Sequence, residues 1–281
     1  DEITANVFDT IRVDGDISFT DGGAFVSKQS LESFEVIGDT TFDNPGFKVA
    51  DTGFLIFGGD VVFDIVGPSI IADDGTSALD VIDGIIFGGS VTGGFNFDIQ
   101  ASAIGDITII GQLEEGEIYI NQLGVAASNN SGSGNNAETV ALDGSNLSDY
   151  TIGKITINTT NFIGAVNNSL FDGDSYFQAL GAIGDISISA GGSSSLQTAL
   201  FNDSTAEVDF IVGNGNLGNT SDAGIDFDGD GTIGGTTNNA SISLIDEETA
   251  NFTSGVVSIG NVTVNAARLG LNNNDTVLAA S

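Results

Sequence analysis

The strongest chemical motif in the sequence is a row of alternating carboxylates in the segment Asp226-Phe227-Asp228-Gly229-Asp230-Gly231-Thr232-Ile233. Carboxylates two residues apart can direct their oxygens at one hard cation, and the glycine in the sixth position allows the sharp turn of a calcium loop. The seventh position contributes a backbone carbonyl. We therefore predict a Ca²⁺ site whose ligands are Asp226, Asp228, Asp230 and Thr232.

The calcium motif matches only the first part of a complete EF-hand loop. Its twelfth position is Thr237, where a bidentate Glu is expected, and the flanking residues lack helical periodicity. A dockerin-like or solenoid-type calcium loop could use the same half-motif without two helices. The alternative interpretation is a solvated Asp-Gly turn.

Composition excludes several classes of function. The 281 residues include 39 acidic and 5 basic side chains, a formal net charge of −34, so nucleic-acid binding through clustered Lys and Arg is excluded. The absence of His and Cys removes Ser-His-Asp triads, thiol nucleophiles and the usual zinc ligands. Paired carboxylates remain for glycoside hydrolysis, but with no Trp and three Tyr the chain is poorly equipped to stack sugars. We predict no enzyme; a polysaccharide-active β-helix is the least favoured alternative.

The same charge has a physical consequence for a compact fold, because like charges repel one another. Salt screens part of that repulsion, and bound divalent cations neutralise more of it. We therefore expect a saline habitat or calcium-dependent folding and assembly.

Short strands dominate the pattern of apolar residues. Runs such as Glu117-Ile118-Tyr119-Ile120 and Ile155-Thr156-Ile157-Asn158 alternate with a period of two, and 40 Gly residues separate them. Such alternation indicates strands with one buried face. The sequence therefore predicts an all-β fold.

Two short phrases recur. Ile56-Phe57-Gly58-Gly59-Asp60-Val61 returns as Ile86-Phe87-Gly88-Gly89-Ser90-Val91. Ile104-Gly105-Asp106-Ile107-Thr108-Ile109 has relatives starting at Ile152, Ile183 and Ile259. The phrase glycines are separated by near multiples of about fifteen, and each is expected to supply the φ > 0 of a tight corner. Stacked units of this kind predict a parallel β-solenoid of roughly 20 to 25 residues per turn, with an antiparallel sandwich or jelly roll as the alternative.

These phrases resemble the β-strand repeats of secreted bacterial surface proteins, including surface-layer and adhesin-like chains. The resemblance extends over about half of the chain and implies an extracellular structural β protein. It carries over no functional residue.

We expect a single repeat-built domain over residues 1–281, with an insertion or boundary at 125–145, where a polar Asn, Ser and Gly run lies. The start at Asp1-Glu2-Ile3 suggests signal-peptide cleavage and hence export to the cell surface. No apolar run reaches the length of a transmembrane helix.

Apolar phrases such as Gly53-Phe54-Leu55-Ile56-Phe57 and Asp83-Gly84-Ile85-Ile86-Phe87 belong either to the core or to a subunit interface. We therefore predict a secreted structural protein that binds copies of itself, with calcium, to form a surface layer (S-layer) or an extracellular filament. The alternative is an adhesin or carbohydrate-binding module whose partner is a cell-surface glycan.

Overall fold

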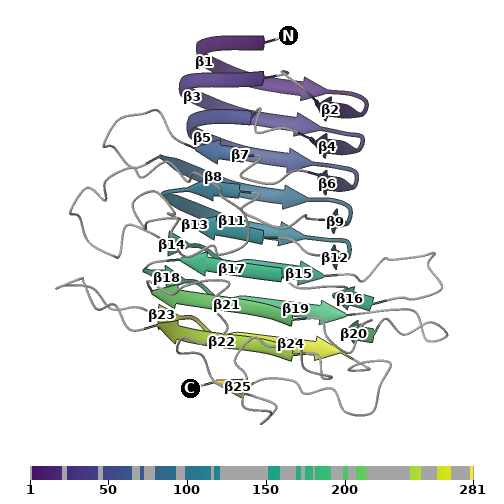
Figure 1. Ribbon diagram of the computed structural model, residues 1–281, viewed down its shortest axis with the longest axis vertical. Helices are drawn as coiled ribbons and strands as arrows, with labels where there is room; N and C mark the ends of the chain where they lie inside the picture. The colour runs from purple at the N-terminus through teal and green to yellow at the C-terminus, as the bar shows by residue number, and fades with distance from the viewer. Residues whose placement is uncertain are drawn as a thin grey trace.

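The chain forms a stack of parallel strands, which Figure 1 shows from the side. The two termini lie at opposite ends of the stack. No helix occurs among the described residues, which confirms the all-β prediction. The computed structural model describes residues 2–20, 24–43, 47–64, 70–72, 80–92, 99–114, 117–120, 151–158, 169–171, 175–179, 181–190, 199–201, 207–213, 241–247, 258–266 and 279–280.

Successive turns of the chain place their strands in three stacks, which we call the first, second and third faces. Three long strands run through both the first and second faces: β1 (Glu2–Val13), β3 (Ala24–Val36) and β5 (Phe47–Phe57). The first face continues with β7 (Ile70–Ala72), β10 (Ile99–Ala101), β13 (Glu117–Ile120), β17 (Ser175–Ala179), β21 (Glu207–Gly213), β22 (Ser241–Glu247) and β25 (Ala279–Ala280).

The second face continues with β8 (Val81–Phe87), β11 (Ala103–Ile109), β14 (Thr151–Ile152), β15 (Ile155–Asn158), β18 (Ala182–Ile183), β19 (Ile186–Ala190), β23 (Ser258–Ile259) and β24 (Val262–Ala266). The third face consists of β2 (Ile17–Phe19), β4 (Thr40–Phe42), β6 (Val61–Phe63), β9 (Val91–Thr92), β12 (Leu113–Glu114), β16 (Ser169–Phe171) and β20 (Ala199–Phe201). Every strand pairing among the described residues is parallel. The fold is a parallel β-helix, and neither a sandwich nor a jelly roll.

The register between neighbouring turns gives the length of each turn. Val13 pairs with Val36, and Val36 pairs with Phe57, so these turns take 23 and 21 residues. Later steps take 30, 22, 48, 31 and 76 residues, as read between paired residues in neighbouring turns. The prediction of 20 to 25 residues holds for the shortest turns. The period of about fifteen is wrong.

The period fails because the turns differ in length and because the two glycine phrases occupy different corners of the β-helix. Gly59 and Asp60 lie where the chain leaves the second face for the third, immediately before β6. Gly105 and Asp106 lie within β11, at the start of the second face. Only the spacing from Gly89 to Gly105 runs from one corner to the other; the remaining spacings join equivalent corners and differ because the turns themselves differ in length.

The core lies inside the three faces and consists of columns of like side chains. Phe19, Phe42 and Phe63 stack on one another with ring centroids 5.0 and 5.1 Å apart, and Phe57 stacks on Phe87 at 5.5 Å. One inward column runs Val13, Val36, Phe57, Phe87, Ile109, Ile157, Ile188 and Val264. Every second side chain of these strands is buried, as the sequence predicts, and this burial explains the alternation of apolar and polar residues.

The predicted insertion at 125–145 lies outside the described residues. The strands on either side of it, β13 and β14, belong to one turn, on its first and second faces. Among the described residues, the structure contains no helix of the length and hydropathy that a membrane span requires.

Two buried threonines offer a matched test of core polarity. The hydroxyl of Thr52 donates a hydrogen bond of 3.0 Å to the carbonyl of Ala50, whereas the buried hydroxyl of Thr40 has no partner. We expect Thr40→Val to raise the free energy of unfolding by about 1 kcal/mol, because it removes an unsatisfied group, and Thr52→Val to lower it by about 1 kcal/mol. Urea unfolding curves measure both. Equal effects of the two substitutions would contradict the difference in hydrogen bonding.

Close approach of neighbouring turns explains the glycines of the second phrase. A β-carbon at Gly105 would overlap the backbone oxygen of Asp83, whereas one at Gly15 would meet nothing within 4 Å. Neither glycine has a φ in the left-handed region, so the expected need for positive φ is wrong here. We expect Gly105→Ala to lower the free energy of unfolding by about 1–3 kcal/mol, and Gly15→Ala to change it by less than about 0.5 kcal/mol, as measured in the same unfolding assay.

Candidate functional surfaces

The predicted calcium ligands Asp226, Asp228, Asp230 and Thr232 lie outside the described residues. The segment that carries them connects β21 to β22, which are neighbours on the first face. The calcium site therefore stays a prediction. Within the described part of the chain, no three acidic side chains gather closely enough to hold a metal ion.

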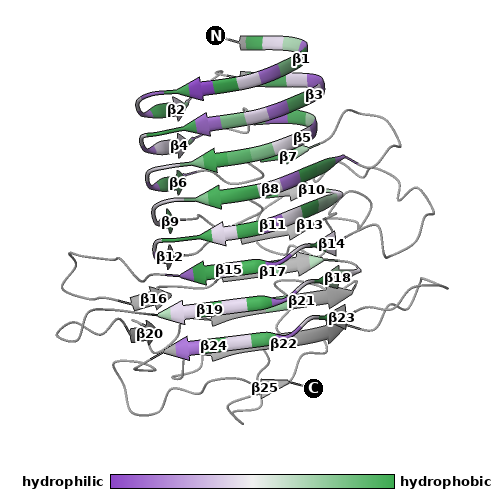
Figure 2. Ribbon diagram, turned by 180° about the vertical axis from the view of Figure 1, so that it is seen from behind, coloured by the Kyte–Doolittle hydropathy of each residue, from purple (hydrophilic) through white to green (hydrophobic). Residues whose placement is uncertain are grey.

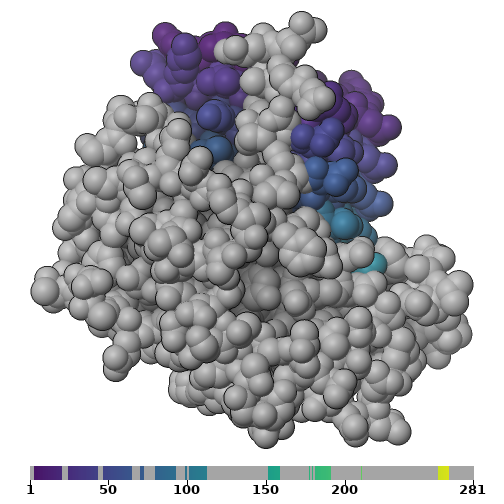
Figure 3. Space-filling view, in the orientation of Figure 1, coloured from purple at the N-terminus to yellow at the C-terminus, as the bar shows by residue number. Residues whose placement is uncertain are grey.

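Aspartates form a ladder at the corner between the second and third faces. The backbone N–H of Asp39 donates to Oδ1 of Asp16 at 3.0 Å, and the N–H of Asp60 donates to Oδ1 of Asp39 at 2.9 Å. Ser90 and Gln112 continue the ladder, each donating its N–H to the side chain one turn before, at 2.8 and 3.2 Å. This corner descends the right side of the molecule in Figure 3, from purple to teal.

A second ladder lies at the start of the second face. The N–H of Lys154 donates to Oδ1 of Asp106 at 2.9 Å, and the N–H of Asn261 donates to Oδ1 of Asp185 at 2.8 Å. The side-chain amide of Asn261 also donates to Oδ1 of Asp185, at 3.1 Å. Because a lysine and an asparagine alternate with the aspartates, this ladder stacks no two carboxylates directly.

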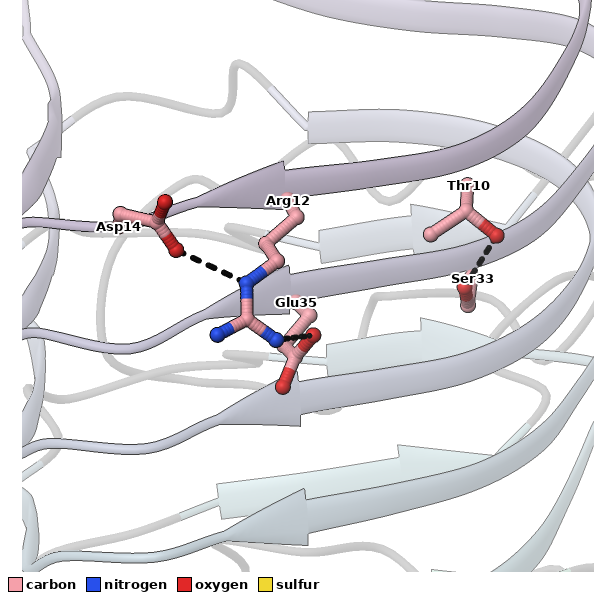
Figure 4. A network of polar contacts seen from close by, with 5 residues as sticks. All are labelled: Thr10, Arg12, Asp14, Ser33 and Glu35. Atoms are coloured by element: carbon pink, nitrogen blue, oxygen red, sulfur yellow. Dashed lines mark hydrogen bonds and ion pairs between the residues drawn. The ribbon is translucent and has the colours of Figure 1, made fainter.

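Arg12 carries the ion pairs of the first turns, shown in Figure 4. Its Nε lies 2.8 Å from Oδ1 of Asp14, and its Nη1 lies 2.8 Å from Oε2 of Glu35 in the next turn. The hydrogen bond to Asp14 and the negative charge of Glu35 raise the pKa of Arg12. Ser33 and Thr10 add a hydroxyl hydrogen bond of 3.1 Å between the same two turns.

The outward side of the second face consists of three columns, named here after one member each. The Phe54 column is Thr10, Ser33, Phe54, Gly84, Asp106, Lys154, Asp185 and Asn261. The Ile86 column is Arg12, Glu35, Ile56, Ile86, Thr108, Thr156, Ser187 and Thr263. The Ile110 column is Asp14, Ile37, Gly58, Gly88, Ile110, Asn158, Ser189 and Asn265.

An apolar patch lies in the middle of these columns. Phe54 is 49% exposed, Ile37 44% and Ile110 40%, and Ile56 and Ile86 between them are half-buried. Figure 2 views the molecule from this side, and β5 and β8 are green along most of their length. The other exposed large apolar side chains in the described part lie elsewhere, on β1 and on β6 of the third face.

The three columns are nearly neutral. Arg12 and Lys154, two of the five basic residues in the sequence, lie among them, against Asp14, Glu35, Asp106 and Asp185. This outer surface therefore has a net charge of −2 in a chain of −34. A second molecule therefore meets less electrostatic repulsion here than at the adjoining corner of Asp16, Asp39 and Asp60.

No family model, curated protein or solved structure matches this chain. The resemblance to secreted surface proteins therefore stays a prediction.

Sequence reasoning did not find either ladder or the patch. The glycine before the polar residue in the repeated phrases was a usable signal, because a glycine precedes each side chain of the two ladders that accepts the N–H of the next turn. The apolar phrases containing Phe54 and Ile86 signalled the patch, but only the register separates their inward residues from their outward ones.

The aspartate ladder predicts opposite effects for two substitutions of Asp39. Asp39→Asn keeps the side-chain oxygen that accepts the N–H of Asp60 and removes a charge stacked between Asp16 and Asp60, so we expect higher stability at low salt. The gain should shrink at about 0.5 M NaCl, where the Debye length falls to a few ångströms. Asp39→Ala removes the acceptor and should lower stability at every salt concentration. Thermal unfolding measures both; destabilisation by Asp39→Asn at low salt would refute the repulsion.

Proposed function

We propose that the chain is a secreted structural protein that self-assembles into a cell-surface layer or an extracellular filament, with calcium. The observation that carries the proposal is the exposed apolar patch of Ile37, Phe54, Ile56, Ile86 and Ile110 on a strongly acidic protein. Contiguous exposed apolar side chains of this kind mark association surfaces.

The architecture supports a structural role. A parallel β-helix presents flat faces whose columns repeat from turn to turn, so a side-by-side contact can extend along the stack. The sequence also lacks His and Cys, the residues on which most nucleophilic and general-base catalysis depends. Both features are typical of a rigid structural subunit that binds other copies of the same chain.

Charge determines the conditions under which assembly occurs. Two copies that each carry −34 repel one another, and the stacked carboxylates of Asp16, Asp39 and Asp60 add to that field at one corner. Calcium bound at Asp226, Asp228 and Asp230 would lower the repulsion, and high salt would screen it.

The test is to image the purified full chain by electron microscopy, and to follow light scattering, with and without millimolar calcium. We expect filaments or sheets when calcium or salt is added, and their loss on chelation at low salt. Monodisperse monomers under every condition would exclude the proposal. Glycan binding by such monomers, abolished by chelation, would instead identify a carbohydrate-binding adhesin.

A matched pair of variants separates a specific calcium site from general screening. Asp228→Asn removes a charge from the predicted loop, and Asp174→Asn removes one from an unrelated sequence, Asp172-Gly173-Asp174. We expect Asp228→Asn to raise the calcium concentration needed for assembly about tenfold or more. The Asp174 variant should behave as the unmodified chain. Equal behaviour of the two variants would show that calcium acts only as a counterion.

A further inference from the structure

We propose that two copies of this chain pair through the outward side of the second face, with the two stacks antiparallel and the two-fold axis between β5 and β8. The inference rests on the self-association proposed above and adds its surface and its orientation. Three properties of the described residues support the inference: the apolar contacts that they would form in the pair, the arrangement of their charges, and the area of the face.

The apolar side chains match under this symmetry. A two-fold axis along the strand direction keeps each column opposite itself and reverses the order of the turns, so β5 faces β8, and β3 faces β11. Ile56 then meets Ile86, and Ile37 meets Ile110. Every large outward apolar side chain of the patch therefore acquires an apolar neighbour or a glycine.

Phe54 and Gly84 lie at the centre of the proposed contact. Within one copy the ring of Phe54 already lies against Gly84, since a β-carbon there would come 2.9 Å from Cε1 of the ring. In the pair, Phe54 also faces Gly84 of the other copy. The two phenyl rings therefore meet beside the axis, where the glycines leave room for them.

The charges of the three columns are also compatible with this orientation. In this orientation Arg12 faces Thr156, Glu35 faces Thr108, and Lys154 faces Thr10. Diagonally, Lys154 approaches Glu35, and Asp106 approaches Arg12. No carboxylate faces another carboxylate across the three columns.

At the corners that flank the face, acidic residues also avoid one another across the pair. On the corner with the third face, Asp39 would face Gln112 and Asp60 would face Ser90. On the opposite corner, Asp83 would face Gly53. Asp39, Asp60 and Asp83 thus each lie opposite a neutral residue.

A parallel arrangement of the two stacks would instead place like charges opposite each other. A two-fold axis along the stack places each turn opposite itself, so Arg12 meets Arg12 and Glu35 meets Glu35. It also exchanges the two flanking corners, which places Glu32 against Asp39. Like charges facing each other oppose association, and the antiparallel pair avoids them.

The face is large enough for a stable pair. Six overlapping turns at about 4.8 Å give about 29 Å, and the strands with their corners give about 20 Å in width. Each copy thus buries roughly 600 Å², or roughly 1,200 Å² in total, at the lower limit of standard protein interfaces.

The first experiment compares two apolar-to-acidic substitutions on different faces. Phe54→Asp lies in the proposed contact, and Val62→Asp changes a side chain that is 36% exposed on the third face. We expect Phe54→Asp to weaken dimerisation by about thirtyfold or more in sedimentation equilibrium, and Val62→Asp to change it little. Circular dichroism checks that both variants fold.

Cross-linking reports the orientation, because the sequence contains no Cys and every introduced thiol is unique. A short bismaleimide should join Ile37→Cys in one copy to Ile110→Cys in the other. Thr156→Cys lies far from its own counterpart in the antiparallel pair but opposite it in the parallel one. Self-linking of Thr156→Cys, or failure of the mixed pair to link, overturns the proposed orientation.

The outcomes separate this inference from the proposed function. Assemblies that persist unchanged in Phe54→Asp refute this contact and leave self-assembly intact. Dimers that depend on Phe54 but never grow further support this contact and contradict the layer or filament. A wild-type chain that stays monomeric at all salt and calcium concentrations, or whose patch binds lipid vesicles or glycan instead of a second copy, overturns the pair.

Discussion

The structure depends on parallel pairing of each turn with the next in a constant register. Backbone hydrogen bonds set the turns about 4.8 Å apart, and the register places each inward side chain on an equivalent one. Ile109, Ile157 and Ile188 occupy one column although 48 and 31 residues separate them. Turn length can therefore vary widely, because only the strands must return to their columns.

The same constraint acts on polar and charged groups. At the corners, a side chain that accepts the N–H of the next turn satisfies a backbone group that would otherwise lack a partner there. Repetition of Asp at such a position stacks like charges, as at Asp16, Asp39 and Asp60. Interruption by Lys154 and Asn261 relieves that repulsion in the other ladder. A stack that repeats favourable contacts also repeats unfavourable ones.

Much of the fold could be predicted from the sequence, because alternation and recurrence are local properties of the chain. The alternating phrases around Ile107, Ile155 and Ile186 are strands in one column, as their likeness suggests. The period could not be predicted, because the turns differ in length and because Gly59 and Gly105 look alike in sequence but lie at different corners. The calcium ligands around Asp228 lie outside the described residues and remain a prediction from spacing alone.

The outward patch follows from a peculiarity of β5 and β8. A strand with one wet face alternates apolar and polar residues, yet Phe54, Leu55, Ile56 and Phe57 are all apolar. Continuous apolar strands are typical of sheets covered on both sides. Here Leu55 and Phe57 are covered by the core, while Phe54 is 49% exposed in a single copy. This pattern supports the pairing proposed above, in which a second copy of the chain covers the outward side of β5 and β8.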